Sequence, residues 1–115
     1  MKRIVLLGAL TTGFVFGGCA SNPVPPAKVT NTQASISAAE AVGATNNPRA
    51  ALHMKLAKEQ LAQGEQLLRD GDDDEARLVL ERARIDAELA MALTREEQAQ
   101  HQARASIEKV RQVGR

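Results

Sequence analysis

The sequence has almost no aromatic side chains. None of its 115 residues is Trp or Tyr, and its two Phe residues are Phe14 and Phe16. From residue 17 onward no Phe, Tyr or Trp ring is available to stack on a base or a sugar, or to form an aromatic cage around a cation. A hydrophobic core in this part must therefore be built from Leu, Ile, Val, Met and Ala, a composition that suits closely packed helices.

Cysteine is equally scarce, because Cys19 is the only one. A single thiol excludes a disulfide within the chain. It follows an uncharged run, residues 4–16, which is preceded by Lys2 and Arg3. As a helix this run would span about 20 Å at ~1.5 Å per residue, less than the ~30 Å hydrocarbon core of a bilayer. Its length and flanks are typical of a secretory signal.

The sequence around this cysteine, Phe16-Gly17-Gly18-Cys19, resembles the lipobox of bacterial lipoproteins. The resemblance implies a signal peptide over residues 1–18 and lipidation of Cys19, whose acyl chains would hold the protein in the lipid bilayer. No Asp follows the cysteine as an inner-membrane retention signal would require, which favours the outer membrane and a chain facing the periplasm. The alternative is cleavage after Ala20, which would release a soluble periplasmic helical chaperone or stress-type protein.

Charge and motifs give no indication of catalysis. Residues 19–115 contain one more acidic than basic side chain, so no bulk attraction for nucleic acid is expected. His53 and His101 lack a second ligand at a helical metal spacing, and no glycine-rich phosphate loop or nucleophile with a histidine partner is recognisable. We therefore expect no enzymatic activity, catalytic residue, metal, cofactor or small-molecule substrate.

The acidic run Asp70–Glu75 invites comparison with a calcium-binding loop. Asp70, Asp72 and Asp74 fit the first three ligand positions of an EF-hand, but Glu75 stands where its turn requires Gly. The run is better interpreted as a turn before a helix, with Asp72 as N-cap and Glu75 completing a capping box.

The first part of the chain after the cysteine contains three prolines, Pro23, Pro25 and Pro26. This composition predicts an extended tether, so that residues 19–31 comprise the lipidated cysteine and its tether, and residues 32–115 the folded domain. A short Ala-rich helix is expected over residues 32–44, ending at Gly43.

A longer helix is predicted over residues 48–70. Asn47 is a favourable N-cap, Pro48 suits the first helical position, and Gly71 suits the position after the last turn. One apolar stripe follows helical spacing. It consists of Ala50, Met54, Ala57, Leu61, Gly64 and Leu68.

A helix of about 40 residues, from residue 73 to residue 112, completes the prediction. Its apolar residues alternate at spacings of four and three, as in a coiled coil, although Arg82 and Glu96 interrupt the pattern. We expect this seam to face a partner; its candidate residues are Leu78, Ile85, Leu89, Ala92, Ala99, Ala103, Ile107 and Val110. Ala76, Ala83, Ala87 and Met91 form a second, flatter side.

The predicted fold is all-α, an antiparallel helical hairpin with a short additional N-terminal helix and a coiled-coil-like C-terminal helix. Because the two long helices differ in length, residues 96–113 extend beyond the hairpin. Either the helix at 32–44 covers them, another chain covers them, or this end frays.

A family resemblance covers residues 32–93. The lipobox, the Pro-rich tether, the Ala/Glu-rich start and the hairpin LAKEQLAQGEQLLRDGDDDEARLVLERARIDAELA resemble small lipoproteins of the domain of unknown function 4398 family. The resemblance implies a helical protein of the bacterial envelope and brings no activity with it. We expect a structural or protein-binding module whose partner is another envelope protein or a second copy, with binding of a cell-wall ligand as a further hypothesis.

Overall fold

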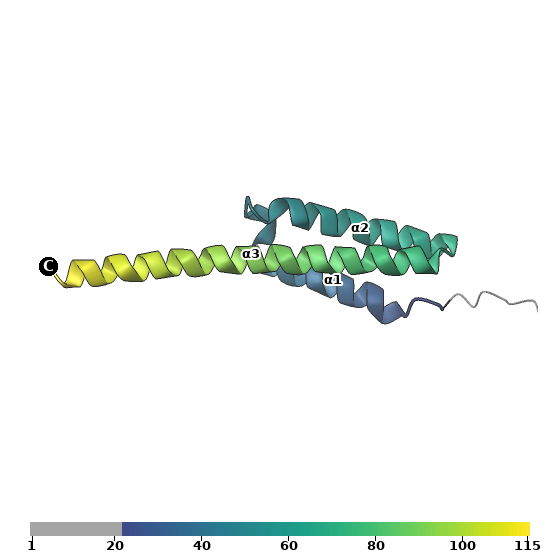
Figure 1. Ribbon diagram of the computed structural model, residues 1–115, viewed down its shortest axis with the longest axis horizontal. Coiled ribbons are helices and arrows are strands. Elements are labelled where there is room, and N and C mark those ends of the chain that lie inside the picture. Colours follow the sequence, from purple (N-terminus) through teal and green to yellow (C-terminus); the bar gives the residue numbers. More distant parts are fainter. Residues whose placement is uncertain (1–21) are drawn as a thin grey trace, which may run out of the picture.

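The computed structural model describes residues 22–115, so the predicted signal peptide and Cys19 lie outside the described residues. It contains α1 (Pro26–Ala41), a 3-10 turn η1 (Ala44–Asn46), α2 (Ala51–Asp70) and α3 (Asp73–Val113). The helices α2 and α3 form an antiparallel hairpin, and α1 lies along α3 and runs parallel to it (Figure 1). The prediction of an all-α hairpin with an N-terminal helix and a long C-terminal helix is confirmed.

The helix α1 begins earlier than predicted. Residues 26–31 were expected in an extended tether, but they form the first turns of α1, so this part of the prediction is wrong. Pro25 is extended and Pro26 occupies the start of the helix, where the fixed φ of proline is favourable and its missing N–H costs no hydrogen bond. The Pro-rich pattern therefore starts a helix here.

The connection from α1 to α2 follows the predicted signals. Gly43 has a positive φ of 87°, which ends α1. The Asn47 side-chain oxygen accepts hydrogen bonds from the backbone N–H groups of Arg49 and Ala50, at 2.8 and 3.2 Å. Asn47 thus caps the turn that leads into α2, as predicted, although the regular helix begins only at Ala51.

The turn between α2 and α3 is closed by backbone hydrogen bonds. Gly71 has a φ of 85°, and its N–H donates to the Leu68 carbonyl while the Asp72 N–H donates to the Leu67 carbonyl. This pair of bonds is the Schellman arrangement, which satisfies carbonyls at a helix end. Asp72 occupies the N-cap of α3, but its side chain makes no capping hydrogen bond, so the predicted capping box is wrong.

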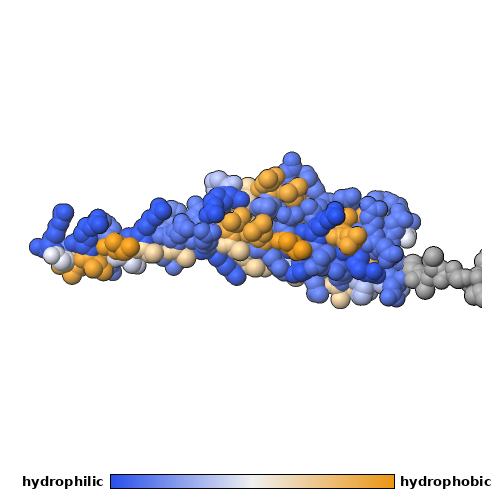
Figure 2. All heavy atoms as spheres, viewed as in Figure 1, coloured by the Kyte–Doolittle hydropathy of each residue, from blue (hydrophilic) through white to orange (hydrophobic). Residues whose placement is uncertain are grey.

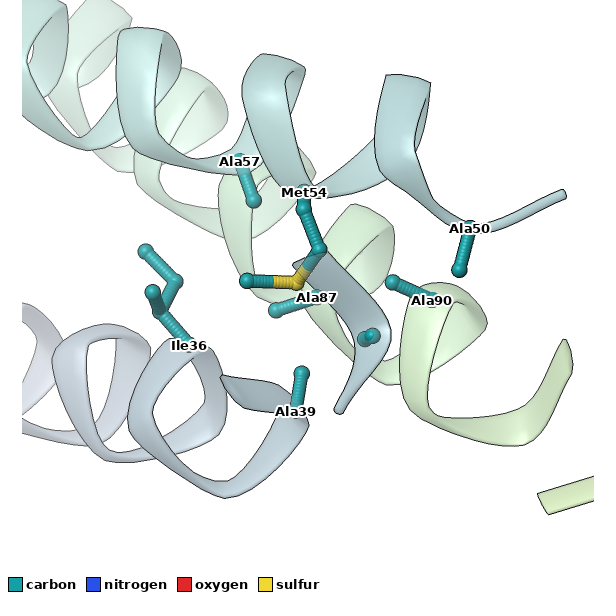
Figure 3. Packing of buried hydrophobic residues seen from close by; sticks show 8 residues of the cluster. Ile36, Ala39, Ala50, Met54, Ala57, Ala87 and Ala90 are labelled. Atoms are coloured by element: carbon teal, nitrogen blue, oxygen red, sulfur yellow. The ribbon is translucent and has the colours of Figure 1, made fainter. Parts of the chain in front are cut away.

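The core between the three helices consists largely of alanine. Figure 3 shows Ile36 and Ala39 of α1 and Met54 of α2 meeting Ala87 and Ala90 of α3. The predicted stripe of α2 supplies Met54, Ala57 and Gly64 as buried residues. In α3 the flatter side faces the bundle, because Ala76, Ala83 and Ala87 are fully buried there. Such small side chains allow close helix packing.

The helices α2 and α3 pack tightly where Gly64 faces Leu80. A Cβ atom on Gly64 would lie 2.7 Å from both Cγ and Cδ2 of Leu80, which is itself fully buried. Ordinary carbon contacts are about 3.5–4.0 Å. The absence of a side chain at Gly64 is therefore what admits the Leu80 side chain.

Candidate interaction surface

The seam predicted on α3 is exposed. Leu78 and Ile107 are each 61% exposed and Val110 is 73% exposed. Ile85 and Leu89 are also exposed, and the small residues of the seam, Ala92, Ala99 and Ala103, are exposed as well. None of these residues contributes to the buried core of the described chain.

The seam and the core lie on opposite sides of α3. At about 100° of rotation per residue, the seam between residues 78 and 92 is centred about 150° from the buried residues of the same segment. Those buried residues are Ala76, Val79, Leu80, Ala83, Ala87 and Ala90. Apolar patches accordingly recur along the surface of α3 toward its C-terminal end (Figure 2). A partner could reach this side without displacing α1 or α2.

The C-terminal part of α3 extends beyond both neighbours. The last link to α1 is the hydrogen bond from Gln98 Nε2 to the Val42 carbonyl, at 3.0 Å, and residues 99–115 are all exposed. Of the three possibilities left open for residues 96–113, coverage by the helix at 32–44 is wrong, since that helix ends beside Gln98. We call residues 99–115 the overhang.

Charge is distributed unevenly along the elongated three-helix molecule, residues 22–115, which we call the rod. At the hairpin turn, acidic side chains predominate: Glu65, Asp70, Asp72, Asp73, Asp74 and Glu75, against the single base Arg69. The overhang is basic, with Arg104, Lys109, Arg111 and Arg115 against Glu108. The side chains of Arg82, Arg95 and Lys109 form no ion pair within residues 22–115. These cations are free to meet acidic groups of a partner.

A cluster of charged residues fastens α1 to α3. Lys28 Nζ lies 2.8 Å from Glu81 Oε2, and Arg84 Nε donates to Glu81 Oε1 at 3.2 Å. The hydrogen bonds from Arg84 and Lys28 lower the pKa of Glu81 from 4.5 to about 2. Next to this cluster, the buried Thr32 hydroxyl lies within hydrogen-bond distance of the Leu80 carbonyl, at 3.2 Å. The cluster therefore holds the start of α1 in place.

A second polar cluster links α2 to α3 and was not predicted. His53 Nδ1 lies 2.8 Å from Asp86 Oδ1, and Gln60 Nε2 donates to Asp86 Oδ2 at 3.0 Å. His53 and Gln60 are seven residues apart on α2, which places them on one side of the helix. That spacing could have indicated a shared polar contact, but nothing in the sequence identifies Asp86 as its partner. The cluster orients α2 against α3.

The sequence also suggested a lipid anchor at Cys19 and raised the question of a metal site at the acidic turn. The predicted lipidation site, Cys19, is not among the described residues. Between residues 22 and 115, no helix combines the length and apolar character needed to cross a membrane. In the same range, no three His, Cys, Asp or Glu side chains gather where they could hold a metal ion, and the acidic turn Asp70–Glu75 is included.

Comparison with known proteins places the chain in a family. No curated protein and no solved structure matches it. A family model described as "Domain of unknown function (DUF4398)" matches residues 27–111, from the first turn of α1 nearly to the end of α3. The match extends past both ends of the segment 32–93 that carried the resemblance in the sequence, and it includes all three helices. The chain belongs to the DUF4398 family.

Proposed function

We propose that this protein is a lipoprotein of the bacterial outer membrane whose α3 seam binds another protein in the periplasm. The observation that carries the proposal is the row of exposed apolar side chains on α3, with Leu78, Ile85 and Leu89 beside the bundle and Val110 in the overhang. Exposed apolar patches rimmed by polar residues are typical of a protein interaction site. The proposed role is structural, without catalysis.

Burial of the exposed apolar side chains of α3 by a partner would contribute a favourable free energy of binding. Complete burial of a Leu, Ile or Val side chain contributes about 1.5–3 kcal/mol. Leu78, Ile85, Ile107, Val110 and Val113 are each more than half exposed, so a partner could gain about 1 kcal/mol from each. The residues of the seam recur three, four or seven positions apart along α3, which suits a helical partner, since helices recognise one another through such rows.

The proposed location of the protein in the cell rests on the sequence of its N-terminal segment. The run at 4–16, the two preceding basic residues and Cys19 have the pattern of a lipoprotein signal. The chain would enter the bundle at the start of α1, beside the hairpin turn, because Arg77 Nη2 donates to the Asn22 carbonyl at 2.6 Å. A short linker would therefore connect the anchor to that end of the rod.

The N-terminus can be tested by mass spectrometry of the protein from its membrane fraction. We expect an acylated Cys19 in the natural chain, and loss of the acyl mass and of membrane association in Cys19→Ser. A mature chain that begins at Ser21 would instead support the soluble periplasmic alternative and refute lipid anchoring.

Partner binding can be tested separately in cells. A photoreactive amino acid at Ile85 should crosslink to a discrete protein adduct, whereas the same amino acid at Ala62, an exposed position on α2, should not. Absence of any adduct at Ile85 and at Ile107 would refute the binding role, whatever the N-terminus carries.

A further inference from the structure

The structure assigns to the α3 seam a specific partner: a second copy of this chain, bound with the two α3 helices antiparallel. This inference rests on the proposed role of the seam as a binding surface and names its occupant. The evidence is the charge distribution of the rod together with the order of side chains along the seam.

The ends of the rod are complementary in charge. The hairpin turn is acidic through Asp70, Asp72, Asp73 and Asp74, and the overhang is basic through Lys109 and Arg111. Antiparallel pairing places the overhang of each copy beside the acidic turn of the other, so that both ends attract. Parallel pairing would place acidic beside acidic and basic beside basic. Opposed potentials of this kind determine the orientation of helix pairs.

The charged residues within the seam favour the same orientation. In a parallel pair in register, Arg82 would face Arg82 of the other copy and Glu96 would face its own equivalent. In an antiparallel pair with its two-fold axis near residues 90 and 91, Arg82 lies one layer from Glu96 of the second copy. This register places opposite charges in adjacent layers of the seam and keeps like charges apart.

The residues that flank the seam fit the same register. Arg95 lies opposite Glu88 of the second copy, and Lys109 lies opposite Asp74, each pair occurring twice by symmetry. Arg95 and Lys109 have no ion pair within residues 22–115, whereas Glu88 and Asp74 already pair with Arg84 and Arg77 of their own chain, so each of these carboxylates would be shared between two cations in the dimer. Leu78 faces Ala103 and Leu89 faces Ala92, so large residues meet small ones in these layers, whereas Ile85 lies in the same layer as Glu96. Alternation of this kind lets layers interdigitate.

The extent of the contact is adequate for a stable dimer. The α3 helix has 41 residues, about 60 Å in length. The seam and its flanking positions would place roughly 20 residues of each copy in the interface, close to the 20–30 of a standard interface. Because the seam lies opposite the core of each bundle, α1 and α2 of both copies remain outside the contact. In this register residues 99–108 of the overhang lie along the start of α3 of the second copy, and residues 109–115 reach its hairpin turn.

Orientation can be tested by thiol crosslinking of the full chain carrying Cys19→Ser, so that introduced cysteines are the only thiols. A tagged Ala103→Cys chain mixed with an untagged Leu78→Cys chain should give the mixed dimer with a short bismaleimide. Leu78→Cys alone should not link, since its two thiols would lie about 37 Å apart. An Ala62→Cys chain, exposed and away from the seam, is the matched control.

The register can be tested by charge reversal. We expect Arg95→Glu to raise the dissociation constant of the dimer by about tenfold or more, because it creates two like-charge pairs. Glu88→Arg combined with Arg95→Glu should restore dimerisation to within about threefold. Light scattering with refractive-index detection measures the mass, because the chain has no Trp or Tyr for absorbance.

Several results would overturn the inference. Linking of Leu78→Cys with itself would indicate a parallel pair, and equal linking of the Ala62→Cys control would indicate nonspecific association. A monomeric mass, or an Arg95→Glu chain that dimerises unchanged, would also refute it. If the chain is monomeric while Ile85 crosslinks to a different envelope protein in cells, self-association fails and the proposed function stands. If neither contact is found, both fail.

Discussion

The contact between Gly64 and Leu80 allows a prediction in which one substitution has opposite effects in two backgrounds. A methyl group at Gly64 would lie 2.7 Å from two atoms of the buried Leu80 side chain, about 0.8 Å or more inside a normal contact. Overpacking of this kind costs about 1–3 kcal/mol. Alanine within a helix is otherwise more favourable than glycine by about 1 kcal/mol. Gly64→Ala should therefore destabilise the protein by about 1 kcal/mol.

The reverse is expected when Leu80 is shortened. Leu80→Ala removes the atoms that the new methyl group would meet, at a cost of about 2–5 kcal/mol for the buried side chain. In that background Gly64→Ala should stabilise by about 1 kcal/mol, through helix propensity and partial filling of the space. The coupling between the two positions should therefore be about 2 kcal/mol, well above the ~0.5 kcal/mol scatter of independent sites.

The assay is urea unfolding of all four proteins, followed by circular dichroism at 222 nm. Trimethylamine N-oxide in every sample would raise the stability of Leu80→Ala enough to define its folded baseline. If Gly64→Ala stabilises both backgrounds equally, the close approach of α2 and α3 does not exist as described.

Three other predictions concern the charge cluster, the cap and the overhang. Because the pKa of Glu81 is lowered to about 2, its contribution to stability is complete above about pH 4.5 and is lost as the pH falls toward 2. Glu81 is about one-third exposed, so we expect Glu81→Gln to remove at most about 1 kcal/mol, with no loss in the control Glu65→Gln, whose carboxylate has no ion pair within residues 22–115; acid titration of the melting temperature checks this. Asn47→Ala removes the two capping hydrogen bonds and the bond from Asn47 Nδ2 to Glu97, and should cost about 1–2 kcal/mol of unfolding free energy in denaturant melts, whereas Asn46→Ala should be nearly neutral; equal losses would refute the capping role. Deletion of residues 99–115 should abolish dimerisation while the melting temperature of the dilute monomer stays within a few degrees, because these residues bury nothing in the single chain. A large fall in that temperature would show that the overhang supports the bundle.

The sequence predicted the helices well because the capping and turn residues that begin and end them act locally. Asn47, Gly43 and Gly71 act on the adjacent backbone, and each does so where expected. The start of α1 was mispredicted because proline favours both extended chain and the first helical turn. The choice was decided by contacts distant in sequence, among them the ion pair of Lys28 with Glu81.

The interaction surface was predictable as an apolar stripe along one helix, but which side of that helix faces the other two helices was not predictable. Periodicity identified the seam around Leu78 and Ile85 and also the flatter side around Ala83, without showing which side the hairpin buries. At Gly64 the missing side chain leaves room for the Leu80 side chain, so the buried side of α3 combines small residues such as Ala83 with one large residue that fits against a glycine. The pair of His53 with Asp86 depends on the rotation of α2 about its axis, which no local pattern determines.

The parallel orientation of α1 and α3 has a mechanical consequence. The chain enters at the start of α1 and leaves at the end of α3, and these points are at opposite ends of the rod (Figure 1). Tension between an N-terminal anchor and a partner on the overhang would slide α1 along α3. The contacts of Lys28, Thr32 and Val42 with α3 would then share the load and break together. Shear of this kind resists force better than peeling, in which contacts yield singly, so the bundle is suited to transmit tension along its length.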